Sequence, residues 1–202
     1  MTSIIVLLFA WLVTPSAPQK SSSAATPRAG VIVVFETEKG SIEIEVNAER
    51  APSTAANFLK YIDAGFYDGG EFHRTVRPDT ETNRTHPIQV IQARRARGRQ
   101  GFPAIALERT SATGLKHSDG AVSMARIAGR PDSATSDFFI CIGDQPSLDQ
   151  GGGRNDDNQG FAVFGRVVSG MDIVRAIQAS PVRPGTQTLQ PPVRILKAYP
   201  KK

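Results

Sequence analysis

The sequence VIVVFETEKGSIEIEV, residues 31–46, decides the class of fold. Its second half alternates: Ile42, Ile44 and Val46 share one face of an extended chain, and Glu43 and Glu45 share the other. This pattern is typical of a strand with one buried and one solvated face. The intervening EKG is a turn sequence, so we expect two strands joined by a tight turn.

The rest of the chain has the patterns of two helices and several short β-strands. Residues 51–65 have helical spacing, with Pro52 in the first turn and Gly65 as a stop, and residues 169–180 form a second amphipathic pattern. Apolar, β-prone segments occupy residues 72–76, 88–92, 120–125, 138–142, 161–168 and 191–200. Many short strands, two helices and no βαβ alternation indicate a mainly β protein, an antiparallel barrel or sandwich with helical caps.

Composition limits the classes of function. The 202 residues carry a net charge of +5, which permits acidic partners without demanding nucleic acid. The single cysteine, Cys141, cannot form an intrachain disulfide, and we expect a buried thiol with no metal cluster around it. The basic run of Arg94, Arg95, Arg97 and Arg99 is interpreted as a solvated loop face, with an anionic partner or a membrane surface as the alternative.

The N-terminal region predicts export. The ten apolar residues 4–13, IIVLLFAWLV, suit the core of a secretory signal better than a membrane span. A cut after Ala25 would remove residues 1–25 as a signal peptide and leave a short linker, 26–30, before a domain at 31–202. No Lys or Arg precedes the apolar run, so an uncleaved anchor and a mis-assigned start remain alternatives. We expect a periplasmic or secreted protein with no membrane span in the mature chain.

The segment FHRTV, residues 72–76, places strong polar groups in a β-prone run. If the strand alternates regularly, Phe72 and Arg74 share one face, and His73 and Thr75 share the other. An arginine beside a large aromatic is either an ion-paired structural residue or a working group at the edge of an apolar pocket.

The ordered motifs FHRTV, VIQ, GAVSMAR, SDFFICIGD, SLD and FAVFGRVVSGMDIV resemble the cyclophilin family of peptidyl-prolyl cis-trans isomerases. The resemblance covers roughly residues 31–200. It implies a closed eight-stranded antiparallel β-barrel capped by two α-helices. It also implies a monomeric enzyme that needs no cofactor or metal and acts on Xaa-Pro bonds of proline-containing peptides and of unfolded or folding proteins.

The resemblance also assigns residues. It implies that Arg74 is catalytic, with His73 beside it and Gln92 holding the arginine and the substrate backbone. The implied substrate-binding residues are Phe72, Ala125, Arg126, Asp137, Phe139, Leu148 and Phe161. From the residues alone, His73 is equally well a structural histidine, Gln92 could satisfy a loop backbone, and the phenylalanines could be ordinary core residues.

This sequence departs from the family pattern at four places. An insertion, residues 77–89, follows the arginine; Ala93–Arg94 replaces two glycines; Asp137 replaces a glutamine. Ser147 stands where cyclosporin-sensitive members have tryptophan. We expect weak cyclosporin binding and hypothesise an Arg126–Asp137 ion pair. The alternative function is a weakly catalytic or non-catalytic module that binds proline peptides.

Overall fold

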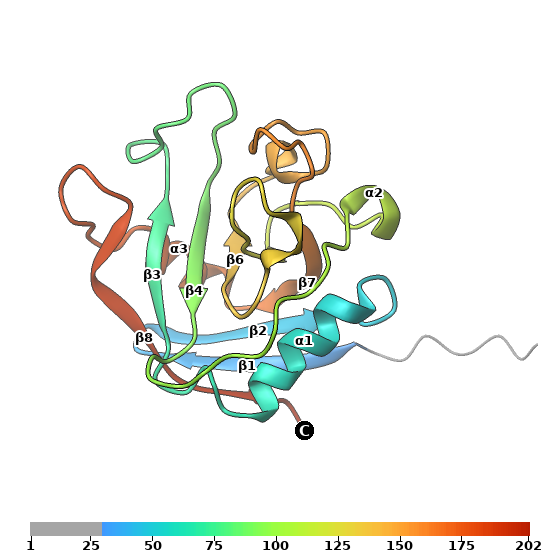
Figure 1. Ribbon diagram of the computed structural model, residues 1–202. Helices are drawn as coiled ribbons and strands as arrows, with labels where there is room; N and C mark the ends of the chain where they lie inside the picture. Colours follow the sequence, from blue (N-terminus) through green and yellow to red (C-terminus); the bar gives the residue numbers. More distant parts are fainter. Residues whose placement is uncertain (1–29) are drawn as a thin grey trace, which may run out of the picture.

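The computed structural model describes residues 30–202 and shows a closed, entirely antiparallel barrel (Figure 1). The strand order is β1-β2-β7-β5-β6-β4-β3-β8. The strands are β1 (Val31–Thr37), β2 (Gly40–Val46), β3 (Glu71–Val76), β4 (Val90–Arg94), β5 (Ala121–Met124), β6 (Phe138–Cys141), β7 (Ala162–Ser169) and β8 (Thr188–Pro200). The predicted mainly β barrel is confirmed. The proposed signal peptide and nearly all of the linker lie outside the described residues.

The hairpin β1–β2 forms as the alternation predicts. Phe35 pairs with Ile42 and Val33 with Ile44, and all four side chains are buried in the barrel. The turn closes through the Thr37 hydroxyl, which donates to the Gly40 carbonyl at 2.7 Å. The glutamates of β2 therefore point away from the interior, as expected for the solvated face.

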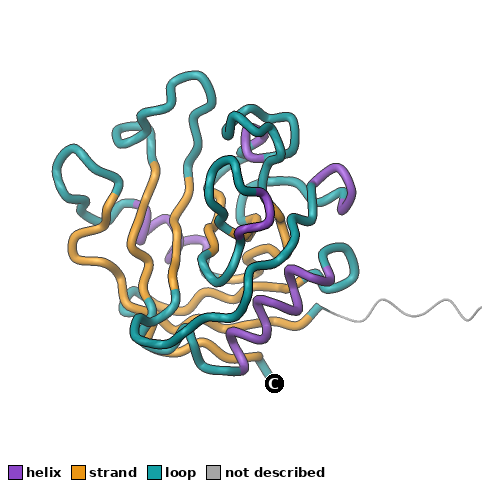
Figure 2. The backbone as a smooth tube through the Cα atoms, viewed as in Figure 1, coloured by secondary structure: helices purple, strands orange, loops and turns teal. Residues whose placement is uncertain are grey.

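Two helices contribute to the barrel interior. Helix α1 (Pro52–Asp63) contacts β7 and β8, and α3 (Met171–Gln178) contacts β2, β3 and β4. Phe58 of α1 packs against the aromatic rings of the interior, with its ring centroid 4.7 Å from that of Phe164. A third helix, α2 (Thr110–Thr113), is a single turn that the sequence did not predict. Figure 2 shows how much of the chain between the strands is loop.

Strands β4 and β6 carry buried apolar side chains on both of their faces, and those on the outer face mark the candidate site. Ile91 and Phe138 belong to the barrel interior. Val90, Phe139 and Cys141 turn the other way, into a second buried cluster. This outer cluster consists of Val76, Ile88, Val90, Ala121, Phe139, Cys141, Leu148 and Val163. Burial raises the pKa of the Cys141 thiol, in agreement with its predicted burial.

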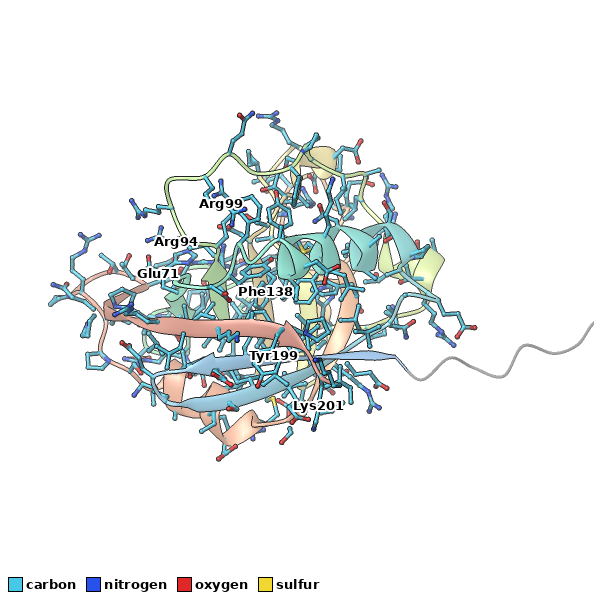
Figure 3. The ribbon with its side chains drawn as sticks, turned by 90° about the horizontal axis from the view of Figure 1, so that it is seen from below. Glu71, Arg94, Arg99, Phe138, Tyr199 and Lys201 are labelled. Atoms are coloured by element: carbon cyan, nitrogen blue, oxygen red, sulfur yellow. The ribbon has the colours of Figure 1, made fainter. Side chains whose placement is uncertain are left out.

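The basic run at the end of β4 is largely engaged by the protein itself. Arg94 forms an ion pair with Glu71 on β3, and the two labelled side chains lie next to each other in Figure 3. The Arg99 guanidinium lies 3.8 Å from the centroid of the Phe66 ring and donates to the Ala64 carbonyl at 2.9 Å. Arg94 and Arg99 are therefore engaged within the protein, and contact of the run with an anionic partner or a membrane surface stays a prediction. Between residues 30 and 202, no helix combines the length and apolar character needed to cross a membrane.

Candidate functional site

A β-bulge at His73 controls how β3 presents its arginine. Phe72 pairs with Ala93 on β4, but Arg74 pairs with the adjacent Gln92, so His73 is an extra residue on β3. The register towards β8 shifts at the same place. Phe72 therefore points into the barrel, with 1% of its surface exposed, whereas Arg74 points to the outer face. The prediction that Phe72 and Arg74 share a face is wrong, because the bulge interrupts the alternation on which it rested.

Two glutamines hold the guanidinium of Arg74. Its Nη1 donates to Gln92 Oε1 at 2.9 Å, and its Nε and Nη2 donate to Gln187 Oε1 at 3.0 and 2.6 Å. Of the five N–H groups of an arginine, three are thus engaged within the described residues, and two remain for a ligand. Burial lowers the pKa of Arg74, and the nearby Arg154 lowers it further. The group still stays charged, so it is a cationic donor that the two glutamines hold in place.

Gln187 was not predicted as part of the site. It lies 113 residues after Arg74, just before β8, and no sequence motif marks it. Its Nε2 donates to the carbonyl of Thr80 at 3.0 Å. The insertion after Arg74 is therefore tied to the arginine through a single glutamine side chain.

Arg74 lines a cavity of about 220 Å³ that lies over the outer cluster. The structure brings several predicted residues together in its wall: Arg74, Gln92, Ala125, Arg126, Phe139, Leu148 and Phe161. It adds residues that the sequence reasoning missed: Ile88, Val90, Ala128, Arg154 and Asn155. The cavity has apolar walls from residues such as Phe139, Leu148 and Phe161, and its rim carries three arginines, of which Arg74 is held by two glutamines.

The aromatic wall of this pocket is held from behind by a buried histidine. Phe139 and Phe161 meet edge to face at 5.4 Å, and the His117 ring stacks on Phe139 at 5.9 Å. His117 Nδ1 lies 2.8 Å from Asp149 Oδ1, and its Nε2 lies 3.0 Å from Ser123 Oγ. Burial lowers the pKa of His117 although Asp149 opposes the shift. Because Ser123 has no exposed surface, this Ser–His–Asp arrangement orients the wall and offers no nucleophile to a substrate.

Arg126 does not pair with Asp137, and the hypothesis of that pair is wrong. Its Nη1 and Nη2 donate to the two carboxylate oxygens of Asp157, each at 2.7 Å. These hydrogen bonds bring the pKa of Asp157 down to about 2. The guanidinium also lies 5.1 Å from the centroid of the Phe161 ring, so the pair supports the pocket rim.

Asp137 lies outside the lining of the pocket. Its carboxylate accepts from the Ser136 hydroxyl at 3.2 Å, and burial raises its pKa. Its carbonyl accepts from the N–H of Ala125 at 2.8 Å, so that N–H is already engaged within the protein. What Asp137 and Ala125 do for a bound peptide therefore remains a prediction.

His73 is set apart from the pocket as well. No group in residues 30–202 hydrogen-bonds to its buried Nδ1. Burial, with a smaller contribution from Arg94, lowers the pKa of His73 to about 4. A histidine with this pKa is neutral at pH 7 and adds no charge beside Arg74.

Comparisons with known proteins agree with this geometry. The family model "Cyclophilin type peptidyl-prolyl cis-trans isomerase/CLD" matches residues 32–199. A peptidyl-prolyl cis-trans isomerase of Acinetobacter baylyi is 36% identical over 155 residues, which are 76% of this chain and 74% of that protein. Peptidyl-prolyl cis-trans isomerase A of Dickeya dadantii is 32% identical over 171 residues, 82% of each chain.

Solved structures show the same fold. A cyclophilin type peptidyl-prolyl cis-trans isomerase of Cryptosporidium parvum, crystallised in the presence of the dipeptide Ala-Pro, matches with a TM-score of 0.67 and 20% identity. The match covers 85% of this chain and 99% of that one. Because the family model spans the barrel from β1 to β8, this chain belongs to the cyclophilin family of peptidyl-prolyl cis-trans isomerases.

Proposed function

We propose that this enzyme accelerates rotation about Xaa-Pro bonds by donation from Arg74 to the proline nitrogen in the apolar pocket. Isomerase activity follows from membership of the family, and the proposal concerns the mechanism. The observation that carries it is the fixation of Arg74 by Gln92 and Gln187 at the edge of that pocket.

The chemistry requires stabilisation of a twisted amide. Resonance holds the Xaa-Pro bond planar behind a barrier of about 20 kcal/mol, and uncatalysed exchange takes tens of seconds or more. Acceleration to milliseconds needs roughly 5–6 kcal/mol of transition-state stabilisation. In the twisted state the proline nitrogen regains its lone pair, so a donor aimed at this nitrogen favours the transition state over the planar ground state.

The residues of the pocket suit this task. Two N–H groups of Arg74 remain available, and the side chain needs no rearrangement because the glutamines already hold it. Phe139, Leu148 and Phe161 form apolar walls that fit a proline ring and exclude water. Where the aromatic walls exclude water, the interaction between the guanidinium and the nitrogen is stronger than it would be in bulk water. No covalent bond is made or broken, and rotation requires no nucleophile.

The alternative, a binding module without catalysis, loses most of its sequence support. Ala93 is fully buried in the barrel interior, and Arg94 is paired with Glu71, so these substitutions do not reach the pocket. Asp137 also lies outside the pocket lining. An isomerisation assay separates the two functions, since a binding module would bind proline peptides without changing their exchange rate.

The Cryptosporidium relative crystallised with Ala-Pro supports proline-containing peptides as ligands here. We assign the physiological role to the folding of exported proteins, on the basis of the apolar segment at residues 4–13. That segment lies outside the described residues, and the role rests on its sequence alone.

The test of the mechanism is removal of the arginine. Arg74→Ala is expected to lower kcat/KM for an Ala-Pro peptide by at least about 100-fold, with little change in melting temperature. Arg74→Lys is expected to be nearly as poor, because a lysine cannot reproduce the planar fork that the two glutamines hold. The matched control is Arg166→Ala, which removes an exposed arginine paired with Glu45 away from the pocket. Near-normal turnover by a folded Arg74→Ala enzyme would overturn the proposed role.

A further inference from the structure

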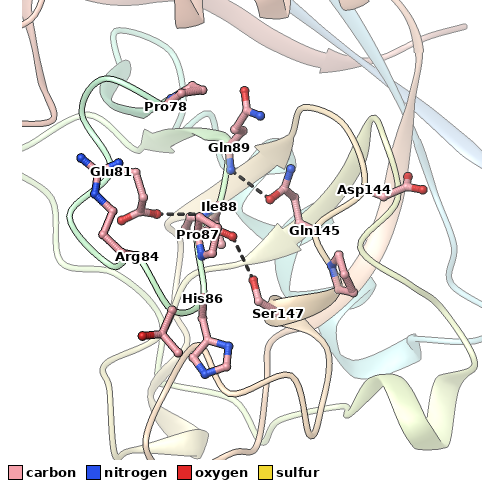
Figure 4. Close-up of a pocket in the computed structure, with 12 residues that line it drawn as sticks. Pro78, Glu81, Arg84, His86, Pro87, Ile88, Gln89, Asp144, Gln145 and Ser147 are labelled. Carbon is pink, nitrogen blue, oxygen red and sulfur yellow. Dashed lines mark hydrogen bonds between the residues drawn. The ribbon is translucent and has the colours of Figure 1, made fainter.

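A second, larger pocket lies beside the cavity that Arg74 lines, which is the proposed proline pocket. Its volume is about 540 Å³, and it is formed by the insertion that follows Arg74 and by the loop at residues 144–147 (Figure 4). Apolar groups come from Pro78, Pro87, Pro146 and Ile88. The volume lies within the range of about 300–1,000 Å³ that is typical of sites for small ligands, so it admits a large side chain.

Hydrogen bonds hold the two walls of this pocket together. The Ser147 hydroxyl donates to the Pro87 carbonyl at 3.3 Å, and the N–H of Gln89 donates to Gln145 Oε1 at 3.0 Å (Figure 4). Gln145 in turn donates to the Ile142 carbonyl at 2.7 Å. Because prolines restrict the backbone of both walls, the pocket is formed before any ligand arrives.

A buried carboxylate fixes the inner side of the insertion. Glu81, 3% exposed, accepts from the N–H of Ile88 at 2.9 Å and from Nη1 of Arg154 at 2.9 Å. Although burial raises the pKa of Glu81, the N–H groups of Asn83 and Ile88 and the Arg154 guanidinium bring it below the ordinary value. The carboxylate is therefore charged at pH 7 and anchors the insertion.

The two pockets share one wall. Ile88 lines both of them, and Arg154 lines the proline pocket while it binds Glu81 and the His86 carbonyl of the second pocket. An extended peptide advances about 3.3 Å per residue. A chain whose proline sits beside Arg74 can therefore cross Ile88 into the adjoining second pocket, and three extended residues would span about 10 Å.

We propose that this pocket is a second substrate subsite, which takes an aromatic or large aliphatic side chain within about three residues of the isomerised proline. The inference rests on the proposed function of the first pocket. We take its occupant to be part of the same peptide, because the two pockets adjoin at Ile88, which lines both of them. The small side chain of Ser147 on its wall leaves this space open.

The test is a series of proline peptides with alanine at every flanking position, in which phenylalanine replaces one alanine at a time. Burial of one phenylalanine ring is expected to raise kcat/KM about tenfold at one position within three residues of the proline. Ser147→Trp fills the pocket and is expected to reduce the ratio of kcat/KM for the phenylalanine peptide to kcat/KM for the all-alanine peptide to about one. Thr82→Trp adds the same bulk to the exposed side of the same insertion and is expected to keep the ratio.

The outcomes separate the two proposals. If the wild-type enzyme isomerises the all-alanine peptide through Arg74 but shows no preference for phenylalanine at any position, the subsite is refuted and the first pocket stands. A preference that survives Ser147→Trp equally refutes the subsite. If Arg74→Ala leaves the all-alanine rate unchanged, the proposed mechanism itself fails. Should Ser147→Trp not fold, Thr85→Trp, on the opposite wall, tests the same ratio.

Discussion

Replacement of Gln187 by leucine is expected to slow catalysis without removing any group that touches the substrate. Gln187 Oε1 accepts two hydrogen bonds from Arg74, at 3.0 and 2.6 Å, and leucine has nearly the same size but no acceptor. Without it, only Gln92 still holds the guanidinium. The donor that the proposed mechanism requires is then free to leave its position.

The size of the effect follows from the bonds that are lost. The two bonds share one acceptor, so together they count as about one hydrogen bond to a charged group, worth about 1.5–3 kcal/mol. We assume that this energy serves to position Arg74 for the transition state. Each 1.36 kcal/mol of lost transition-state stabilisation lowers the rate by a factor of ten. Gln187→Leu is therefore expected to lower kcat/KM by about 10- to 150-fold, mainly through kcat.

The assay is exchange of an Ala-Pro peptide, together with the NMR signal of the Arg74 Nε–H, which reports the hydrogen bond directly. Gln187→Glu keeps an acceptor for the arginine and is expected to recover part of the Nε–H signal. Gln100→Leu, the same substitution at an exposed loop position, is the control. An unchanged kcat/KM in Gln187→Leu, with the Nε–H signal lost, would refute the reasoning that this bond positions the catalytic donor.

Three further predictions concern other parts of the chain. Cyclosporin is expected to inhibit the wild-type enzyme weakly, and the Ser147→Trp variant is expected to bind it more tightly because the missing indole is restored. Equal affinities of the two proteins for cyclosporin would show that residue 147 does not control the sensitivity. Since the pKa of His73 is about 4 in the folded chain and about 6.5 when unfolded, the unfolded chain binds the proton first. The stability of the wild-type protein should therefore fall as the pH drops from 6.5 to 4, and the stability of the His73→Gln variant should fall less. Melting-temperature curves that run parallel for the two proteins over this pH range would contradict the prediction. Protein recovered from the producing cell is expected to begin near Ala25 or Thr26 by N-terminal sequencing, and a soluble cytoplasmic form that begins at Met1 would contradict export.

The barrel was predictable because its signals are local. The alternation of residues 41–46 and the Pro52 and Gly65 boundaries of the first helix depend on neighbours in sequence, and the structure places these elements within a few residues of the expectation. The single turn of α2 was missed because four residues carry no measurable period.

Residues of the site were predictable from the sequence only where they belong to one of the family motifs. The positions of Arg74, Gln92 and Phe139 around one pocket follow the order of the motifs. The bulge at His73 could not be predicted from the motifs. It depends on the register of β3 with β4 and β8, which the alternation within one strand does not reveal. The partner of Arg126 was assigned wrongly for a related reason: Asp157 comes from a long loop whose path the sequence does not fix.

The separation of the two apolar clusters has a consequence for how this enzyme can diversify. The aromatic residues that hold the barrel together face inward, whereas Phe139, Leu148 and the walls of both pockets lie outside it. A change at a pocket residue such as Thr85 can thus alter substrate preference without touching the barrel interior. A lineage can therefore change its peptide preference through exposed positions of the insertion while the fold of the barrel stays the same.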